Sequence, residues 1–240
     1  MNMEQKLVFI TGANQGIGLE TSKNLILSGN YHVILGSRNP AKGAKSIKAL
    51  RALPDVKGTA SWVQIDVTDD KSVDAAAAQI ASQYGKLDIL VNNAGIISLA
   101  SPPSREALRQ ILDVNVVGAL STTKALLDLL RKAPEKGLVS VSSSTGCITH
   151  AVNPKSPYYS PLGTEYRTSK AAVNMLMVIY QARLKDDGFK VLGADRVCVL
   201  RILQGNQSRC AIEALQSRRM VAAEWRLWSR ERRMRMLGGC

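Results

Sequence analysis

Lys6-Leu-Val-Phe-Ile-Thr11-Gly12-Ala-Asn-Gln-Gly16-Ile-Gly18 is the stretch that decides the fold of this chain. The apolar run at its start predicts a buried strand, and the residues from Gly18 to Ser28 predict a helix. A strand that runs through a glycine-rich turn into a helix is typical of a phosphate cradle. Gly12 permits the tight turn, Gly16 lets the backbone approach a ligand, and Gly18 allows close packing of helix on strand. The free N–H groups and positive dipole at the helix N-terminus suit a pyrophosphate.

The next apolar run, residues 31–37, predicts the second strand and carries information on the nucleotide. An acidic residue near its end would bind a ribose 2′-hydroxyl, but Arg38 stands there instead, 20 residues after Gly18. A cation at this place suits a 2′-phosphate, although a solvated surface arginine would look the same. The sequence therefore favours NADP(H) over NAD(H).

Strand and helix patterns alternate along the rest of the first 194 residues. They predict an α/β fold: a Rossmann-type, doubly wound parallel sheet in a single domain, with a cleft at the carboxyl ends of its strands. Residues 147–165 hold three prolines and no periodicity, which predicts a long loop of functional importance. Further strands are predicted over residues 60–65, 87–91, 138–141 and 189–192. Further helices are predicted over residues 40–53, 104–130 and 166–184, and another after the third strand that ends at residue 84.

Polar or small residues follow three of these strands. After the third, Asp66 is placed to accept a hydrogen bond from an adenine amino group. After the fourth, the run 92–95 (Asn-Asn-Ala-Gly) lets the backbone lie against a cofactor, or forms a plain turn. After the fifth, the serines of residues 142–144 direct hydroxyl groups into the cleft. Each of these patterns is weak alone.

Tyr166 and Lys170 are the strongest candidates for chemistry. Four residues apart in a predicted helix, they lie one turn apart on the same face, as many surface pairs also do. A nearby ammonium favours the phenolate form, so Tyr166 is a plausible proton donor to a carbonyl or acceptor from an alcohol. Asn115, inside an apolar helical stretch, needs a hydrogen-bonding reason: it holds a water or bends the helix next to Gly118.

Taken together, these residues resemble the short-chain dehydrogenase/reductase family over residues 6–194, and most closely its carbonyl-reductase-like members that prefer NADPH. The resemblance rests on Thr11-Gly12-x-x-x-Gly16-x-Gly18, Asp66, Asn92-Asn93-Ala94-Gly95, Asn115, Ser143 and Tyr166-x-x-x-Lys170, which occur in the family's order. It implies hydride transfer between a nicotinamide and a small ketone, aldehyde or secondary alcohol. It also implies a homodimer formed by the helices that carry Asn115 and Tyr166.

The resemblance further implies a role for each matching residue. Tyr166 protonates the substrate oxygen, Ser143 hydrogen-bonds it, Lys170 binds the nicotinamide ribose, and Asn115 holds a water that connects Lys170 to solvent. Ser142 and Ser144 remain alternatives to Ser143. The implied cofactor contacts are Thr11, Gly12, Asn14, Gln15, Gly16, Ile17, Gly18, Arg38, Asp66, Val67, Asn93, Ala94, Gly95, Tyr166 and Lys170.

The last 46 residues read differently from the rest of the chain, so we divide it into an NAD(P)-binding domain, 1–194, and an atypical arginine-rich tail, 195–240. The family would continue into a Pro-Gly turn over the nicotinamide and a last edge strand, which is doubtful here. The tail has 10 Arg and no Lys, whereas residues 1–194 have 15 Lys and 7 Arg. We hypothesise a different reading frame or splice end. Finding no family-like continuation in the transcript's other two frames would contradict this.

Composition excludes several other classes. The net charge of +13 invites a nucleic-acid hypothesis, but nearly half the excess lies in the tail, so we expect no nucleic-acid partner. No apolar run reaches the ~18 residues of a membrane span, and a polar start without a signal peptide predicts a cytoplasmic protein. Two histidines and four scattered cysteines predict no metal site. A nucleotide-binding protein without turnover, a sensor or a damaged enzyme, remains the alternative function.

Overall fold

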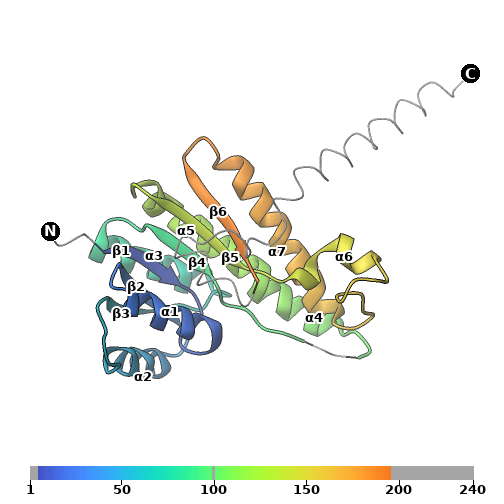
Figure 1. The fold of residues 1–240 in the computed structure, drawn as a ribbon, viewed down its shortest axis with the longest axis horizontal. Helices are drawn as coiled ribbons and strands as arrows, with labels where there is room; N and C mark the ends of the chain where they lie inside the picture. Colours follow the sequence, from blue (N-terminus) through green and yellow to red (C-terminus); the bar gives the residue numbers. More distant parts are fainter. Residues whose placement is uncertain (1–4, 99–100, 196–240) are drawn as a thin grey trace, which may run out of the picture.

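A six-stranded parallel sheet forms the centre of the molecule in a computed structural model, which describes residues 5–98 and 101–195 (Figure 1). The strand order is β3-β2-β1-β4-β5-β6, so the chain starts in the middle of the sheet and builds outward in both directions. This confirms the predicted doubly wound Rossmann-type fold. The strands are β1 (Lys6–Ile10), β2 (Tyr31–Ser37), β3 (Thr59–Gln64), β4 (Ile89–Asn92), β5 (Lys136–Val141) and β6 (Phe189–Ala194).

The order of the strands reverses at β1, which pairs with β2 on one side and with β4 on the other. In such sheets the crevice outside the carboxyl ends of the strands at this switch point is where ligands bind. The glycine turn follows β1 and the Asn92–Gly95 segment follows β4, so both predicted cofactor segments lie at the switch point.

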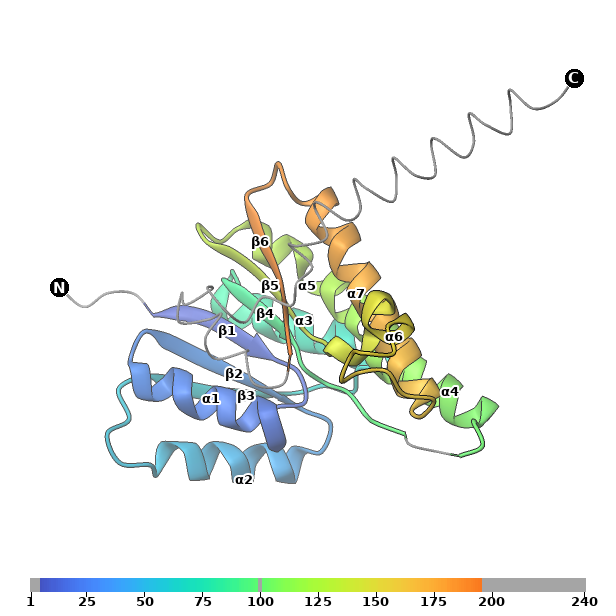
Figure 2. The same cartoon turned by 45° about the vertical axis from the view of Figure 1, so that its right-hand side comes forward.

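Helices cover both faces of the sheet (Figure 2). One core packs α1 and α2 against the sheet through side chains such as Leu25, Ile26 and Ile47. The other core packs α3, α5 and α7 on the opposite face, around side chains such as Ile80 and Leu126. The helices are α1 (Gly16–Ser28), α2 (Pro40–Arg51), α3 (Asp70–Tyr84), α4 (Arg105–Leu112), α5 (Gly118–Arg131), α6 (Ile148–Val152) and α7 (Thr164–Arg183).

Two predicted elements differ from the structure. The helix predicted over residues 104–130 is interrupted by a π-helical turn, Asp113–Val117, that joins α4 to α5 and contains Asn115. The loop predicted over 147–165 contains the short helix α6 and the first two residues of α7, and α6 is too short for a helical period to be recognised in the sequence. The predicted tail domain begins at Asp195, and everything predicted beyond that residue lies outside the described part of the chain.

Among the described helices, none is both long and apolar enough to cross a membrane.

Candidate active site and nucleotide cleft

The three glycines of the turn after β1 have different surroundings. Gly12 and Gly16 adopt positive φ angles, +63° and +58°, which side chains rarely tolerate. A Cβ on Gly12 would lie 2.9 Å from the Ala94 Cα, and one on Gly18 would lie 2.5 Å from the Asn93 amide nitrogen. A Cβ on Gly16 would meet nothing within 4 Å. Gly12 and Gly18 therefore serve packing, while Gly16 faces the open space that a ligand's phosphates would occupy.

The start of α1 lies at that open space. Gln15, the residue before the helix, makes no side-chain capping hydrogen bond, so the first N–H groups of α1 are not capped in this way. Such groups and the helix dipole suit an anion. Two neighbouring residues that were predicted to contact the cofactor also have partners within the protein. The Asn14 carbonyl accepts a hydrogen bond of 3.0 Å from the Ser46 hydroxyl, and Ile17 packs against the core.

Thr11 and Asn93 join the two loops at the switch point. The Thr11 hydroxyl accepts hydrogen bonds from the backbone N–H groups of Asn93 and Ala94, both at 3.0 Å. In return the Asn93 side-chain amide donates to the carbonyl oxygens of Thr11 and Gly12, at 2.7 and 3.2 Å. These two side chains are thus used to hold the loops together, and their predicted part in cofactor binding is to set the shape of the backbone there.

Arg38 and Asp66 lie next to each other at the carboxyl ends of β2 and β3. The Arg38 side chain is 80% exposed, and its Nε lies 4.0 Å from an Asp66 carboxylate oxygen. The other Asp66 oxygen accepts hydrogen bonds from the backbone N–H and hydroxyl of Thr68, at 3.1 and 2.8 Å. Val67 packs under the first residue of α5, where a Cβ on Gly118 would lie 2.8 Å from it. The arginine is therefore free to turn toward a phosphate, whereas Asp66 shapes its own turn.

Tyr166 and Lys170 occupy adjacent turns of α7, as their spacing predicts. The Lys170 ammonium lies 5.7 Å from the centre of the Tyr166 ring and donates a hydrogen bond of 2.7 Å to the Val141 carbonyl. Lys170 is 6% exposed, so its charge is held in a site with little water. Because Val141 ends β5, this bond fixes the ammonium at the carboxyl edge of the sheet.

Of the three candidate serines, two are engaged away from Tyr166. The Ser142 hydroxyl bonds to the Asn174 side chain of α7 at 2.5 Å, and the Ser144 hydroxyl donates to Asp195 at 2.7 Å. The Ser143 hydroxyl shares a hydrogen bond of 2.9 Å with the Thr145 hydroxyl, a partner that can itself rotate. The Ser143 oxygen also accepts a hydrogen bond of 3.2 Å from the Thr145 N–H, so all three serines have partners in the structure and the choice of Ser143 stays a prediction.

Asn115 lies in the π-helical turn and is 2% exposed. Its side chain makes a pair of hydrogen bonds with the backbone of Ile96, accepting from the N–H at 2.8 Å and donating to the carbonyl at 3.0 Å. Its amide also donates to the Ser169 hydroxyl at 3.0 Å. The helix is thus distorted at Asn115 by a π-helical turn, and the side chain connects the loop after β4 to α7 beside Lys170.

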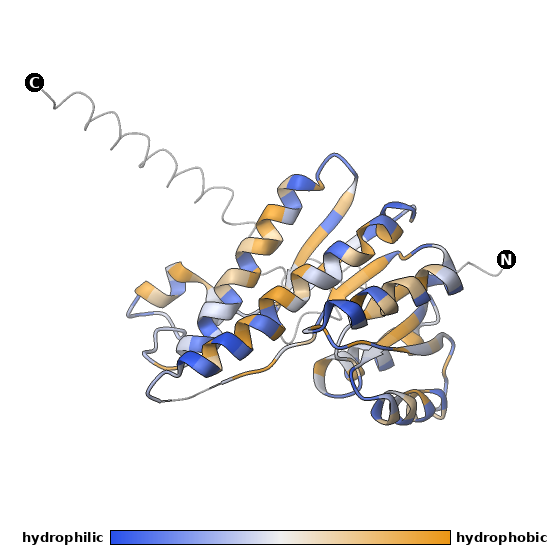
Figure 3. Ribbon diagram, turned by 180° about the vertical axis from the view of Figure 1, so that it is seen from behind, coloured by the Kyte–Doolittle hydropathy of each residue, from blue (hydrophilic) through white to orange (hydrophobic). Residues whose placement is uncertain are grey.

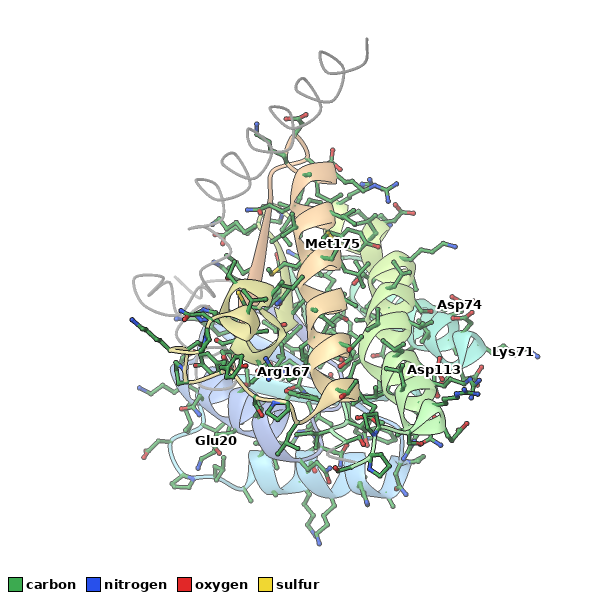
Figure 4. All side chains as sticks on the ribbon, turned by 90° about the vertical axis from the view of Figure 1, so that its right-hand side faces the viewer. Glu20, Lys71, Asp74, Asp113, Arg167 and Met175 are labelled. Atoms are coloured by element: carbon green, nitrogen blue, oxygen red, sulfur yellow. The ribbon has the colours of Figure 1, made fainter. Side chains whose placement is uncertain are left out.

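Several residues that position the site have no signal in the sequence. A Cβ on Gly146 would lie 2.5 Å from the Lys170 carbonyl carbon, so the turn after Ser143 rests directly on α7. The Arg167 guanidinium donates to the carbonyls of Thr145, at 3.2 Å, and Ser160, at 2.8 Å. These contacts join residues 7 to 24 positions apart, and no periodic pattern in the sequence reveals them. Figure 4 shows Arg167 at the base of α7, on the side of the loop that precedes it.

Glu165, next to Tyr166, is fully buried. One carboxylate oxygen accepts a hydrogen bond of 2.7 Å from the Ser104 N–H at the start of α4, and the other has no hydrogen-bond partner. In the described part of the chain no cluster of histidine, cysteine or carboxylate side chains could hold a metal ion.

Comparison with known proteins agrees with this geometry. A family model described as short chain dehydrogenase matches residues 6–198. The short-chain dehydrogenase/reductase tropE of Talaromyces stipitatus is 36% identical over 204 residues, which cover 79% of this chain and 77% of the relative. The 3beta-hydroxysteroid dehydrogenase 1 of Eggerthella lenta is 31% identical over 79% of this chain and 69% of its own.

Solved structures share the fold. An alcohol dehydrogenase from the archaeon Thermococcus sibiricus, complexed with 5-hydroxy-NADP, superposes with a TM-score of 0.66 at 25% identity, over 80% of this chain and 75% of the other. The structure called gox2181 gives a TM-score of 0.68, also at 25% identity, over 80% and 71% of the two chains.

Proposed function

This chain belongs to the short-chain dehydrogenase family of oxidoreductases, and from that premise we propose that it is an NADP(H)-dependent reductase of a small ketone or aldehyde, or the corresponding alcohol dehydrogenase. One observation carries the proposal: Tyr166 and the buried Lys170 share one face of α7, beside the Ser143 turn and the carboxyl edge of β5. A phenol, a cation and a hydroxyl at one edge are the groups that carbonyl reduction needs.

The chain's own residues fit a nicotinamide dinucleotide. The open side of Gly16 and the start of α1 provide room and N–H donors for a pyrophosphate. The bound nicotinamide supplies the hydride that goes to the carbonyl carbon.

In the proposed reaction, Tyr166 gives its hydroxyl proton to the carbonyl oxygen as that oxygen gains charge. Ser143 donates a hydrogen bond to the same oxygen and stabilises it. The Lys170 ammonium, 5.7 Å from the centre of the Tyr166 ring, offsets the negative charge that the transfer leaves on the tyrosine, and proton uptake from solvent then restores the hydroxyl. Oxidation of the alcohol is the same sequence in reverse.

Arg38 supports the preference for NADP(H). It directly follows β2, where an acidic residue would suit NAD(H), and its side chain is largely exposed and only loosely paired. The Thermococcus sibiricus relative, by its description, was complexed with 5-hydroxy-NADP.

The substrate that the site supports best is apolar. Exposed apolar side chains are frequent in two segments of the chain, the one that follows β4 and the one between β5 and α7. They are Ile96, Ile97, Ile148, Val152, Tyr159 and Leu162, between 44% and 72% exposed. Binding an apolar ketone would remove such surface from water, at about 25 cal/mol per Å² buried. The steroid dehydrogenase among the relatives is named for a substrate of this kind.

A titration and one substitution test the proposal. Fluorescence titration of the full chain is expected to show micromolar binding of NADPH and weaker binding of NADH. Oxidation of NADPH with a panel of apolar cyclic ketones is then expected, and Tyr166→Phe should abolish turnover while leaving NADPH binding within about twofold, because only the proton donor is removed.

The same experiments separate the second candidate, a nucleotide-binding protein without turnover. Binding of NADPH together with no oxidation of it by any carbonyl compound would favour that function. Turnover that survives Tyr166→Phe would contradict the assigned role of the tyrosine.

A further inference from the structure

The segment of the chain that contains α2 carries cations and no acidic residues. Between Glu20 and Asp55 the chain has six Lys or Arg residues and no Asp or Glu. Three of the cations, Lys42, Lys45 and Lys48, follow each other at every third position of α2, and all three are exposed. We call these three lysines the basic ridge. In Figure 3 the outer turns of α2, at the lower right, are blue.

The charges of the basic ridge are not neutralised within the protein. Among the described residues, no ion pair or side-chain hydrogen bond engages the ammonium groups of its three lysines. The nearby Arg51 differs, because its guanidinium donates two hydrogen bonds to the Ala60 carbonyl, at 2.6 and 3.2 Å. The ridge begins four residues after Arg38 and runs away from it along the helix.

From this arrangement we propose that the basic ridge is a capture surface for NADPH, which steers the nucleotide's phosphates toward Arg38 and raises its association rate. This inference rests on the proposed function. NADPH carries a pyrophosphate and a 2′-phosphate, a monoester with about −1.5 to −2 charge at pH 7. A field of one sign raises the local concentration of an oppositely charged ligand and so increases its on-rate. NADH lacks the monoester and should be captured less well.

The distance of Lys45 and Lys48 from Arg38 distinguishes long-range steering of the nucleotide from direct contact with its bound phosphate. At 1.5 Å rise per residue, Lys45 and Lys48 lie about 8 and 12 Å along the axis from the start of α2, and Arg38 comes two residues before that start. At 0.01 M ionic strength the Debye length is about 30 Å, so both charges act on a nucleotide that approaches Arg38; at 0.15 M it is about 8 Å, and their effect shrinks. A residue that touched the bound phosphate would instead slow dissociation at every salt concentration.

The test is stopped-flow binding of NADPH and NADH to the full chain at ionic strengths from about 0.01 to 0.5 M. The variants are Lys45→Glu/Lys48→Glu and the milder Lys45→Gln/Lys48→Gln. The control is Lys132→Glu/Lys185→Glu, which makes the same change of net charge at the ends of α5 and α7, on the opposite edge of the sheet. Unchanged thermal unfolding shows that each variant is folded.

We expect the double glutamate variant to bind NADPH about fivefold more slowly than the control at low salt, and the glutamine variant to fall between. The dissociation rate should stay constant, the effect on NADH should be smaller, and all differences should vanish at high salt. An association rate equal to the control's, or a change confined to dissociation, overturns the inference alone. A wild-type chain that binds neither nucleotide overturns the proposed function and this inference with it.

Discussion

At the scale of single residues, Gly18 is needed for close packing, whereas Gly16, two positions earlier, borders open space. Replacing each by alanine therefore gives a pair of matched substitutions. Gly18→Ala should lower the free energy of unfolding by about 1–3 kcal/mol, because its methyl group would overlap the Asn93 amide and the Ala13 backbone. Gly16→Ala has open space around it and should cost only about 1 kcal/mol for its positive φ. Its methyl group would instead occupy the proposed phosphate site and weaken NADPH binding. Urea denaturation and fluorescence titration measure the two effects, and equal losses of stability in both variants would contradict the division.

A substitution of Arg38 should change the preference for NADPH over NADH without changing the binding of NADH. Arg38→Gln removes a charge-assisted hydrogen bond worth about 1.5–3 kcal/mol to a 2′-phosphate, so NADPH affinity should fall about tenfold or more. NADH affinity should change less than about twofold, since NADH presents no group to this side chain. Titration of both nucleotides measures the ratio. A parallel loss for both would mean that Arg38 supports the fold rather than the phosphate.

The sequence allowed candidate residues for the site to be predicted, but not the residues that contact them. The spacing of Tyr166 and Lys170 places both on one face of α7, because helical periodicity is a local property. The partners of Asn115 are a backbone segment 19 positions earlier and a serine 54 positions later, and distance in sequence hides such contacts. For the same reason the sequence could not predict the different partners of Ser142, Ser143 and Ser144.

At the scale of elements, Arg167 joins three segments of the site. Its guanidinium, which lies in the first turns of α7, binds the turn after Ser143 and the loop that precedes α7. Arg167→Lys keeps the charge but loses the forked geometry, so it should raise KM several-fold while changing kcat little. Arg167→Gln should act in the same direction and more strongly. Steady-state kinetics measure the split, and a fall in kcat with constant KM would show that the arginine acts on the chemistry itself.

His32 connects β2, β3 and α3, and makes their packing sensitive to acid. Its ring nitrogens bond to the hydroxyls of Thr59, Ser61 and Tyr84, at 2.7, 3.0 and 3.1 Å. Burial lowers the pKa of His32 below its usual value, and the positive charge of Arg51 lowers it further. The unfolded chain therefore takes up a proton at a higher pH than the folded protein does.

The consequence is a loss of stability as the pH falls below about 6.5, and no contribution from this group above pH 7.5. Thermal unfolding between pH 7.5 and 5.5 should show a smaller decrease in Tm for His32→Gln than for the wild type, corresponding to less than one proton per molecule. Identical slopes for the two proteins would exclude His32 as a source of the acid sensitivity.

The elements themselves were largely predictable, because strand and helix periods are local and the chain alternates them regularly. All six strands lie where the sequence placed them, with ends shifted by up to two residues. The only sign of the π-helical turn in the sequence was an asparagine among valines before Gly118, and the hydrogen bonds of that asparagine to Ile96 are tertiary contacts that a local pattern does not show. Helix α6 has five residues, too few for a period to be recognised.

At the scale of the whole molecule, we propose that the outer faces of α5 and α7 form the interface of a homodimer. These helices lie side by side, and Figure 4 shows Met175 on the outward side of α7. Their exposed apolar side chains are Val117 and Leu120 before and within α5, and Met175, Val178 and Ile179 on α7, between 40% and 61% exposed. The family resemblance implied pairing through these two helices, and the apolar surface gives it a physical reason.

A charge on this surface should separate the subunits, because an unpaired carboxylate inside an apolar interface costs several kcal/mol. Met175→Glu is expected to convert a dimer near 52 kDa, twice the 26.0 kDa of the chain, into a monomer in analytical ultracentrifugation. Val152→Glu, the same kind of change at an equally exposed apolar residue of α6, is the matched control and should leave the dimer intact. A wild-type monomer, or a dimer that both variants preserve, would place the interface elsewhere or exclude it. Because α7 also carries Tyr166 and Lys170, dissociation of the dimer should reduce turnover as well. NADPH binding should be reduced less, because the glycine turn proposed to bind the pyrophosphate follows β1, in the other half of the sheet.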